Sequence, residues 1–439
     1  MEDTAVILAA GLGTRMKSAL PKALHRLGGR SMLRHLINSA EQVFGRIVVV
    51  IGPGMEAVAR EAAPHACVVQ ADRLGTAHAA SQAAALFGEG EVAVLYADNP
   101  LITPETLRAL LARRRAGDAG LALLAMRPPE PGRYGRVIVE DGAVSRIVEW
   151  ADADAAERQL GLCNAGVFAA PAADFARWLS QVGNDNAKCE YYLTDIVALA
   201  RAEGRRVVAV EAPHTELRGI NSRAELAEAE ADLQARLRLR AMEAGVTLVA
   251  PETVFLSADT LFAPDVVVFP HVVFGPGVTV ESGAEIRSFS HLEGVRIGAD
   301  AMIGPFARLR PGTTIGQGAH VGNFVELKAT ALGDGAKANH LAYLGDASIG
   351  ARSNIGAGTI TCNYDGFAKH RTTIGEGVFV GSDSVLVAPV TIGDGALVTA
   401  GSVITEDVSA DAMAFGRARQ VEKPGRAEAF RAARKQEKP

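Results

Sequence analysis

The chain has 439 residues, of which 48% are hydrophobic and 22% are charged, and its formal net charge at pH 7 is -5. This composition is typical of a folded globular protein and excludes a largely disordered chain. The small acidic excess gives no reason to expect nucleic acid as a partner, because a protein that binds nucleic acid needs cations to neutralise phosphates. The length exceeds one ordinary core, and we expect two domains.

The cysteines and the first residues indicate where the protein works. Its four cysteines lie far apart without a C-x-x-C pair, so the sequence indicates neither a zinc site nor a disulfide framework. The chain begins Met-Glu-Asp and passes into an apolar run, which lacks the basic start and cleavage site of a signal peptide. No apolar stretch approaches the roughly 18 residues that a membrane span needs. We therefore expect a cytoplasmic protein with reduced cysteines and no membrane partner.

The first half of the chain alternates apolar runs with helix-like stretches. The apolar runs at residues 5–10, 47–51 and 92–96 read as strands that are buried on both faces. Alternating strands and helices predict an α/β domain in which helices cover both faces of one sheet. We expect this domain to occupy residues 1–221.

The second half begins with a predicted helix. Residues 222–244 are rich in Ala, Glu, Leu and Arg and contain neither Gly nor Pro, with Ser222 as a plausible N-cap and Gly245 as the stop. We interpret this segment as a linker helix. The second domain then covers residues 245–439, with repeats from about residue 246 to 408 and a terminal helix over Glu422–Gln436.

A glycine-rich string follows the first predicted strand. Residues 8–16 read LAAGLGTRM, and a Pro-Lys pair that ends at Lys22 follows shortly after. Gly11 and Gly13 leave backbone N–H groups unobstructed, so this turn can cradle a polyphosphate, and Arg15 and Lys22 supply cations. The spacing matches neither the dinucleotide-binding G-x-G-x-x-G nor the Walker A motif, which disfavours both hydride transfer and P-loop hydrolysis.

The complete string resembles the signature of the sugar nucleotidylyltransferases, L-x-x-G-x-G-T-R-M followed by P-K. The resemblance implies a Rossmann-like domain that joins a sugar 1-phosphate to a nucleoside triphosphate and releases pyrophosphate, with Arg15 and Lys22 as catalytic residues. Asp98 and Asn221 match the family's Mg²⁺ ligands, and a carboxylate suits this hard cation. The positions that match the family's nucleotide-sugar contacts are Leu8, Ala9, Ala10, Gly11, Lys22, Gln70, Gly75, Thr76, Tyr96, Ala97, Asp98, Tyr134, Gly135, Glu149, Asn164 and Asn221.

Three residues depart from the family's usual pattern around this site. Leu12 stands where Lys or Gln is frequent, Ala97 replaces a usual Gly before Asp98, and Asn99 follows it. None of them removes a proposed catalytic group. We therefore expect them to affect only the fine tuning of triphosphate binding.

Bulky apolar residues recur at every sixth position in three long runs between Leu256 and Ile404. Neither the helical period of 3.6 nor the strand period of 2 accounts for a step of six, whereas a triangular coil with three faces does. The runs are Leu256, Phe262, Val268, Phe274, Val280, Ile286; Ile297, Ile303, Leu309, Ile315, Val321, Leu327; and Ile374, Val380, Leu386, Ile392, Val398, Ile404. They predict a parallel β-helix built from hexapeptide repeats.

Four polar segments interrupt the six-residue period, where functional loops are expected. They read PFARLRPG (305–312), GNFVELK (322–328), NHLAYLGD (339–346) and NIGAGTITCNYDG (354–366). With the amino-terminal motifs they resemble, over nearly the whole chain, the bacterial bifunctional enzymes that combine an N-acetylglucosamine-1-phosphate uridyltransferase with a glucosamine-1-phosphate N-acetyltransferase. The resemblance implies a left-handed β-helix, acetyl-CoA and UTP as co-substrates, UDP-N-acetylglucosamine as product, and a homotrimer whose chains share the acetyltransferase pocket.

Acetyl transfer to an amine requires a neutral nucleophile, so a base must accept a proton near neutral pH, and histidine suits this role. The resemblance assigns the role to His340. It places Arg310 and Lys328 at the sugar phosphate and Tyr343 and Asn354 at the sugar. The positions that match acetyl-CoA contacts are Ala357, Asn363, Tyr364, Lys369, Ser382, Ala400 and Arg417.

Three alternatives stay open at this point. A related enzyme of the same class could use another sugar or another acyl donor, which substrate profiling would separate. A binding or regulatory protein could keep both folds without catalysis, although the retained Arg15, Lys22, Asp98 and His340 argue against it. A zinc-dependent β-helix hydrase is disfavoured, because the histidine spacing of such a site is absent around His340.

Overall fold

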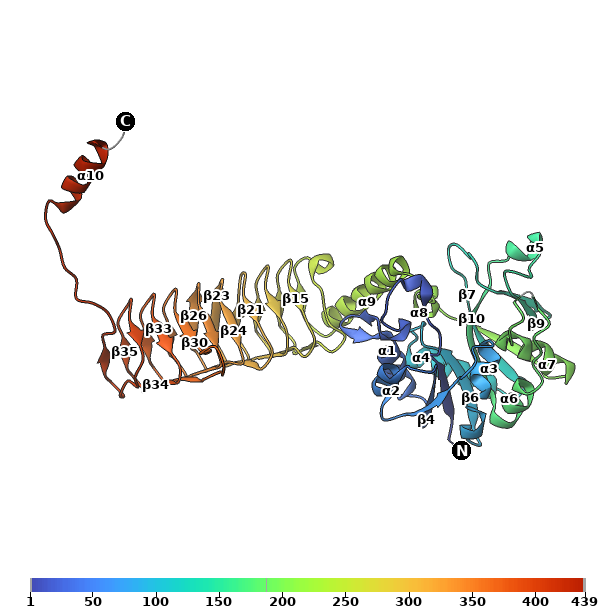
Figure 1. The fold of residues 1–439 in the computed structure, drawn as a ribbon. Coiled ribbons are helices and arrows are strands. Elements are labelled where there is room, and N and C mark those ends of the chain that lie inside the picture. The colour runs from blue at the N-terminus through green and yellow to red at the C-terminus, as the bar shows by residue number, and fades with distance from the viewer. Residues whose placement is uncertain (1, 187, 437–439) are drawn as a thin grey trace. The chain divides into compact units, whose positions relative to one another are not determined.

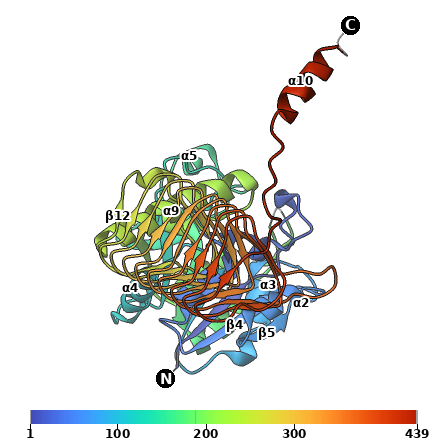
Figure 2. The same cartoon turned by 90° about the vertical axis from the view of Figure 1, so that its left-hand side faces the viewer.

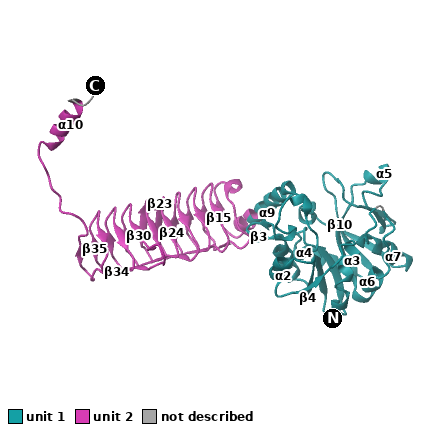
Figure 3. Ribbon diagram, viewed as in Figure 1, with its two compact units in different colours: residues 1–237 teal, residues 238–439 magenta. Residues whose placement is uncertain are grey.

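The computed structural model describes residues 2–186 and 188–436. The chain divides into two compact units, residues 1–237 and residues 238–439 (Figure 3). The division falls within the long helix α9 (Arg223–Glu243). Residues 437–439, with which the predicted second domain ends, lie outside the described residues.

Unit 1 is built on one twisted sheet with the strand order β11-β7-β10-β6-β1-β4-β5 (Figure 1). Its strands are β1 (Thr4–Leu8), β4 (Arg46–Ile51), β5 (Ala66–Val69), β6 (Glu91–Tyr96), β7 (Leu121–Met126), β10 (Cys163–Pro171) and β11 (Val207–Glu211). The α/β prediction is confirmed, and the three predicted strands are β1, β4 and β6. Within this order β10 runs antiparallel to both of its neighbours, whereas the other neighbouring strands are parallel. A hairpin of β8 (Arg136–Glu140) and β9 (Ala143–Val148) joins β10 at its start.

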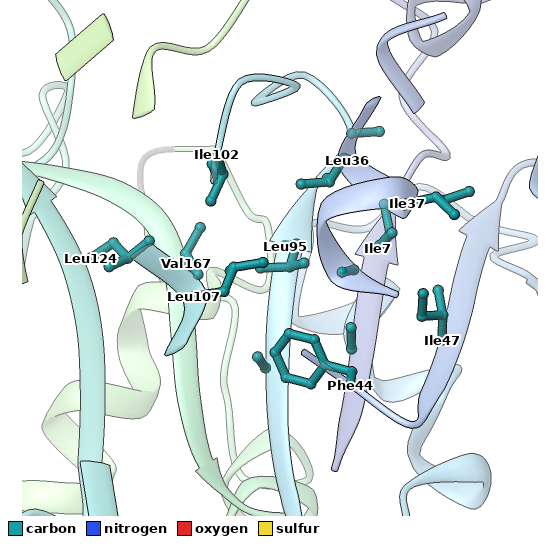
Figure 4. Packing of buried hydrophobic residues seen from close by; sticks show 14 of the residues in the cluster. Ile7, Leu36, Ile37, Phe44, Ile47, Leu95, Ile102, Leu107, Leu124 and Val167 are labelled. Carbon is teal, nitrogen blue, oxygen red and sulfur yellow. The ribbon is translucent and has the colours of Figure 1, made fainter. Parts of the chain in front are cut away.

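Both faces of this sheet are covered by helices, as predicted. In β1, Ala5 and Ile7 join one buried cluster, while Val6 and Leu8 join another, so successive side chains alternate between the two faces. The first cluster, part of which is drawn in Figure 4, packs against α1 (Met32–Ala40), α2 (Glu56–Ala62) and α4 (Pro104–Arg115). The second packs against α3 (Thr76–Ser81), α6 (Ala172–Leu179) and α7 (Ile196–Ala202).

The loops that carry the predicted uridylyltransferase motifs leave the carboxyl ends of neighbouring parallel strands. The glycine-rich string follows β1, and Asp98 follows β6, which pairs with β1. The backbone N–H of Ile220 donates to the Asp98 carbonyl at 2.9 Å, which brings Asn221 to the same edge. Ligands of open α/β sheets bind at this edge, so the fold gathers motifs that are far apart in the sequence.

Unit 2 is a parallel β-helix whose short strands form three sheets, one ten-stranded and two eight-stranded. Its coils run from β12 (Thr247–Leu248) to β37 (Met413–Ala414), and Figure 2 shows them stacked one behind another. The strands that carry site residues are β23 (His320–Asn323), β24 (Glu326–Lys328), β26 (Lys337–His340), β27 (Tyr343–Gly345), β29 (Asn354–Ile355) and β30 (Ile360–Cys362).

The six-residue period is confirmed as the interior of the coil. Every residue of the three predicted runs is buried except Phe262, which is half-buried in the first coils. Most coils repeat after 17 or 18 residues, as in the pairs Ile303 with Val321 and Val321 with Ala338. Ile355 instead pairs with Val380, 25 residues further on, and the additional residues form the loop between β30 and β31 (Thr372–Ile374).

The terminal helix is shorter than predicted. The sequence analysis places its start at Glu422, whereas α10 spans Arg426–Gln436. Pro424 and Gly425 explain the difference, because a proline–glycine pair breaks a helix and Gly425 has a positive φ of 75°.

Among the described residues, no helix combines the length and apolar character needed to cross a membrane.

Candidate active sites

A pocket of about 210 Å³ opens beside the carboxyl ends of β1 and β6 in unit 1. Most of the predicted nucleotide-sugar positions line it together. They are Leu8, Ala9, Ala10, Gly11, Lys22, Gln70, Gly75, Thr76, Tyr96, Ala97 and Asp98. Gly13 lies directly against Lys22, because it has a φ of +63° and a Cβ there would meet the Lys22 Cβ at 2.6 Å. The glycine-rich turn therefore passes closely over Lys22.

Four polar side chains at the pocket converge on one point. The Lys22 ammonium donates to the Asp98 carboxylate at 2.5 Å and to the Asn221 amide oxygen at 2.9 Å. The Arg15 guanidinium donates to the same Asn221 oxygen at 2.8 Å. The structure thus brings together the two predicted catalytic cations and the two predicted metal ligands.

The oxygens of Asp98 and Asn221 also fit a magnesium ion. They already face one cation, the Lys22 ammonium, and both are hard oxygen donors. A small number of protein oxygens, completed by substrate phosphates and water, is the usual surrounding of Mg²⁺ in nucleotide enzymes. The donor set therefore suits this ion.

Three of the five predicted nucleotide-sugar positions that lie outside this lining also form a group. The Asn164 backbone N–H donates to the Gly135 carbonyl at 2.8 Å, and a Cβ on Gly135 would lie 3.6 Å from the Glu149 carboxylate. Burial raises the pKa of Glu149, and a hydrogen bond from Thr194 at 3.3 Å opposes this shift. The carboxylate thus lies in a partly dry site and can accept hydrogen bonds from a ligand's hydroxyl groups.

The loop before Gly135 is connected to Asn221, one of the two predicted metal ligands. The Gly219 backbone N–H donates to the Tyr134 hydroxyl at 3.2 Å, two residues before Asn221. Tyr134 is itself fixed by Arg136, a fully buried side chain that donates to the carbonyls of Tyr134, Gly132 and Arg158. Because these contacts run from Arg136 to the Gly219–Asn221 turn, the loop of the predicted sugar contacts and the predicted metal ligand share one support.

Sequence reasoning missed Arg73 and Glu190, which also line the pocket. The Arg73 Nε donates to the Ala10 carbonyl at 2.8 Å, so its guanidinium supports the glycine-rich turn. Its position between Gln70 and Gly75 is a signal that could have found it. Glu190 comes from a distant segment without a motif, and no signal in the sequence marks it.

The three departures from the family pattern have ordinary surroundings. Leu12 is exposed, and Ala97 is buried and lines the pocket. Asn99 is buried, and its amide donates to the Leu217 carbonyl at 2.5 Å. Asn99 therefore holds the loop that carries Asp98 against α8 (His214–Leu217).

In unit 2 the strand register aligns His340 with three of the predicted acetyl-CoA positions. Asn323 pairs with His340, and the pairs that follow align His340 with Ala357, Ala357 with Ser382 and Ser382 with Ala400. These residues occupy one position on successive coils, at the corner after the ten-stranded sheet. The next predicted residue, Arg417, lies near this corner, 3.9 Å from a Cβ placed on Gly401. Small residues thus follow His340 at the same position of the next three coils.

A polar cluster lies at the next corner of the coils. Asp346 accepts hydrogen bonds from the Lys328 ammonium at 3.1 Å and from the Asn363 amide. Contact with Lys369 and with Asp346 raises the pKa of Lys328, and contact with Lys328 lowers the pKa of Lys369. A Cβ on Gly345 would meet the Tyr343 hydroxyl at 2.5 Å, so Tyr343 lies across this cluster. Four predicted residues therefore meet around Asp346, which the sequence analysis did not single out.

The other predicted residues of unit 2 lie around these two corners. Arg310 donates to Glu326 at 3.0 Å, one coil before Tyr343. Asn354 begins β29 on the ten-stranded sheet, and the Tyr364 hydroxyl donates to the Gly366 carbonyl inside the inserted loop at 2.6 Å. The structure thus distributes the predicted residues over two corners of one chain.

Comparisons with known proteins agree with both units. Residues 5–161 match the family model of the MobA-like NTP transferase domain, and residues 294–329 and 371–406 match that of the bacterial transferase hexapeptide (six repeats). The chain is 69% identical to the bifunctional protein GlmU of Gluconacetobacter diazotrophicus, covering 99% of this chain and 95% of that protein. It is 68% identical to the protein of that name from Granulibacter bethesdensis, with 98% and 96% covered, and 65% identical to that from Acidiphilium cryptum, with 98% and 99% covered. The chain therefore belongs to the family of bifunctional GlmU proteins, enzymes that carry a nucleotidyltransferase domain and a hexapeptide-repeat acyltransferase domain on one polypeptide.

Proposed function

We propose that this bifunctional enzyme makes UDP-N-acetylglucosamine by two successive transfers, each at its own site. An acetyl group passes from acetyl-CoA to glucosamine 1-phosphate on the β-helix, and the product then reacts with UTP in unit 1. The near full-length similarity to GlmU proteins and the matches to both transferase families support this reaction pair. The geometry supports specific residues for each step.

In the uridylyl transfer, a phosphate oxygen of N-acetylglucosamine 1-phosphate attacks the α-phosphorus of UTP. The bond from that phosphorus to the bridging oxygen breaks, and pyrophosphate leaves with the electron pair. Arg15 and Lys22, which meet at the Asn221 oxygen, offset the negative charge that develops on the phosphates. Gln70 and Gly75 hold the uracil ring of UTP, and Gly135, Glu149 and Asn164 hold the sugar.

Asp98 and Asn221 would hold Mg²⁺, and the bound ion would supply positive charge that offsets the negative charge developing on the phosphates. Lys22 contacts both of these oxygens, so we expect its ammonium to move toward a phosphate when the substrates bind. UTP, acetyl-CoA and the sugar phosphates are substrates rather than resident cofactors.

In the acetyl transfer, His340 accepts a proton from the substrate's amino group, and the amine nitrogen attacks the thioester carbonyl carbon. A tetrahedral intermediate forms and collapses, the carbon–sulfur bond breaks, and CoA leaves as a thiolate that takes up a proton. Lys328 and Arg310 hold the sugar phosphate, while Tyr343 and Asn354 hold the sugar. The alignment of His340 with Ala357, Ser382 and Ala400 is the observation that carries this assignment, because it places the base at the end of a path lined by small residues.

We propose that the acetyltransferase site is completed between chains of a homotrimer. His340 ends β26 at one corner of the coil, whereas Lys328 ends β24 at the far side of the following face. One small sugar phosphate must contact both groups, and a second β-helix beside the first would supply the missing side. Exposed aromatic rings also support this arrangement, since Phe289, Phe306 and Phe324 stack at 4.9 and 5.1 Å along the His340 corner.

We place the enzyme in the cytoplasm, without membrane or nucleic-acid partners. Its co-substrates UTP and acetyl-CoA are cytoplasmic metabolites, and the four cysteines are free thiols.

A coupled assay with glucosamine 1-phosphate, acetyl-CoA, UTP and Mg²⁺, from which one component is omitted at a time, tests the reaction pair. His340→Ala should lower acetyl transfer by about 10² or more and spare uridylyl transfer, and Arg15→Ala should do the reverse. Loss of both activities in either folded variant would contradict two independent sites.

A further inference from the structure

Asn323 lies one coil before His340, at the same position of the repeat. The two residues are paired across β23 and β26, and the Asn323 side-chain oxygen lies 2.7 Å from the His340 Nδ1. The Asn323 carbonyl also accepts the Leu341 backbone N–H at 3.0 Å. The side-chain contact is therefore supported by a backbone contact on each side of the corner, and the distance between amide and imidazole is set by the coil.

The acceptor at Nδ1 determines which ring nitrogen is basic. A neutral imidazole carries one N–H and one lone pair, and an amide oxygen at Nδ1 requires the N–H there. The lone pair is then on Nε2, the nitrogen that points away from Asn323. We propose that Asn323 is a positioning residue for acetyl transfer, which fixes His340 as the Nδ1–H tautomer and orients Nε2 toward the substrate amine.

This inference rests on the proposed role of His340 as the base, and it adds what makes that base competent. A free histidine in water prefers the other tautomer, with the proton on Nε2. The lone pair of that form is on Nδ1, so Nε2 cannot accept a proton from the amine. After proton transfer both nitrogens carry hydrogen, and the Asn323 oxygen continues to accept from Nδ1. The same contact therefore serves the ground state and the cationic state of the ring.

The test compares two substitutions of nearly equal size in the full-length enzyme. Asn323→Leu removes the acceptor, whereas Asn323→Asp keeps an acceptor oxygen at the same place. We expect Asn323→Leu to lower kcat for acetyl transfer by about ten-fold or more, with KM for both substrates changed less than about two-fold. Asn323→Asp should retain most of kcat. Gln317→Leu, which removes an exposed amide elsewhere on the β-helix, is the control and should leave kcat unchanged.

A second readout does not depend on catalysis. In protein labelled with ¹⁵N-histidine, the resonances of His340, assigned by comparison with His340→Ala, should show a protonated Nδ1 in the wild type and in Asn323→Asp. Asn323→Leu should shift them toward protonated Nε2. Asn323→Ala serves the same comparison if the leucine variant does not fold.

The outcomes separate this inference from the proposed function. If His340→Ala abolishes acetyl transfer while Asn323→Leu keeps both kcat and the tautomer, the positioning role is wrong and the base assignment stands. If His340→Ala leaves acetyl transfer intact, the proposed base is wrong and the role of Asn323 is overturned with it.

Discussion

The two sites of this enzyme are built in opposite ways. In unit 1, loops from distant parts of the sequence converge, so that Arg15, Lys22, Asp98 and Asn221 meet at one point. In unit 2, the coil repeats the same position at each turn, so the functional residues follow one another along two corners. The sheet of unit 1 thus gathers its predicted site residues from one chain, whereas the β-helix presents its predicted site residues in rows, which we propose a second chain completes.

Mixing inactive variants tests this difference most strongly. His340→Ala and Lys328→Ala should each leave acetyl transfer below about 1% of the wild type. In randomly mixed trimers, about a quarter of the shared sites would combine an intact His340 with an intact Lys328, if these come from different chains. Acetyl transfer should therefore return to about a quarter of the wild-type rate after co-expression.

The corresponding mixture for unit 1 is the control. Lys22→Ala and Asp98→Ala affect residues that contact each other in one pocket, so co-expression should restore no uridylyl transfer. If both mixtures recovered activity equally, or if neither recovered any, the two sites would not differ in whether one chain or several chains form them.

Asp346→Ala should have the next largest effect, because Asp346 accepts hydrogen bonds from two groups with different predicted ligands. Without the carboxylate, Lys328 and Asn363 lose a common partner. We expect KM for glucosamine 1-phosphate and KM for acetyl-CoA to rise together by about ten-fold, as measured by release of free CoA thiol. A rise in only one of the two constants would show that Asp346 supports a single residue.

Glu149→Gln should weaken sugar binding and stabilise unit 1. Burial raises the pKa of Glu149, so the folded state binds its proton more tightly than the unfolded state does. The resulting penalty is absent below the unfolded pKa, grows as the pH rises above it, and is complete once the pH exceeds the raised folded value. Thermal unfolding at pH 7 should therefore show a higher Tm for the variant, and the difference should vanish near pH 4.

The same substitution should raise KM for N-acetylglucosamine 1-phosphate by about ten-fold, because the carboxylate is a stronger acceptor than the amide. Thr194→Val, which removes the hydrogen bond to Glu149, is a useful comparison. An unchanged KM for N-acetylglucosamine 1-phosphate in Glu149→Gln would show that the sugar does not bind at Glu149.

Tyr134→Phe should have the smallest effect. It removes the acceptor of the Gly219 N–H and so loosens the turn that carries Asn221. We expect about a five-fold weaker Mn²⁺ affinity in the presence of UTP, measured by electron paramagnetic resonance of the free ion. An unchanged affinity would show that the sugar loop and the metal ligand are independent.

The sequence predicts most of the fold because both units obey simple periods. The strands around Val6, Val48 and Val94 are continuous apolar runs. The six-residue step corresponds to one face of the three-sided coil. It does not predict the antiparallel β10, since a strand buried on both faces has the same composition in either direction. It also places the start of α10 too early, because charged residues around Glu422 resemble a helix until Pro424 and Gly425 are considered.

The site residues divide in the same way. Motifs identify Lys22, Asp98 and His340, but they do not identify Asn323 or Asp346, whose importance comes from contacts between coils. Those contacts depend on register, and the register changes where a coil has 17 or 25 residues in place of 18. A strict six-residue count therefore loses the alignment of Asn323 with His340 and of Ala357 with Ser382.

The row of small residues beyond His340 also has a defined length along the β-helix. Neighbouring strands in a sheet are about 4.8 Å apart, so the three coil steps from His340 to Ala400 span about 14 Å. A slender donor arm of that length reaches from its anchor to the base, and a shorter one does not. If the acyl donor lies along this row as proposed, deleting one whole coil between His340 and Ala400 should shift the preferred donor length by one such step, and we expect the number of coils to set the length of donor that the site accepts.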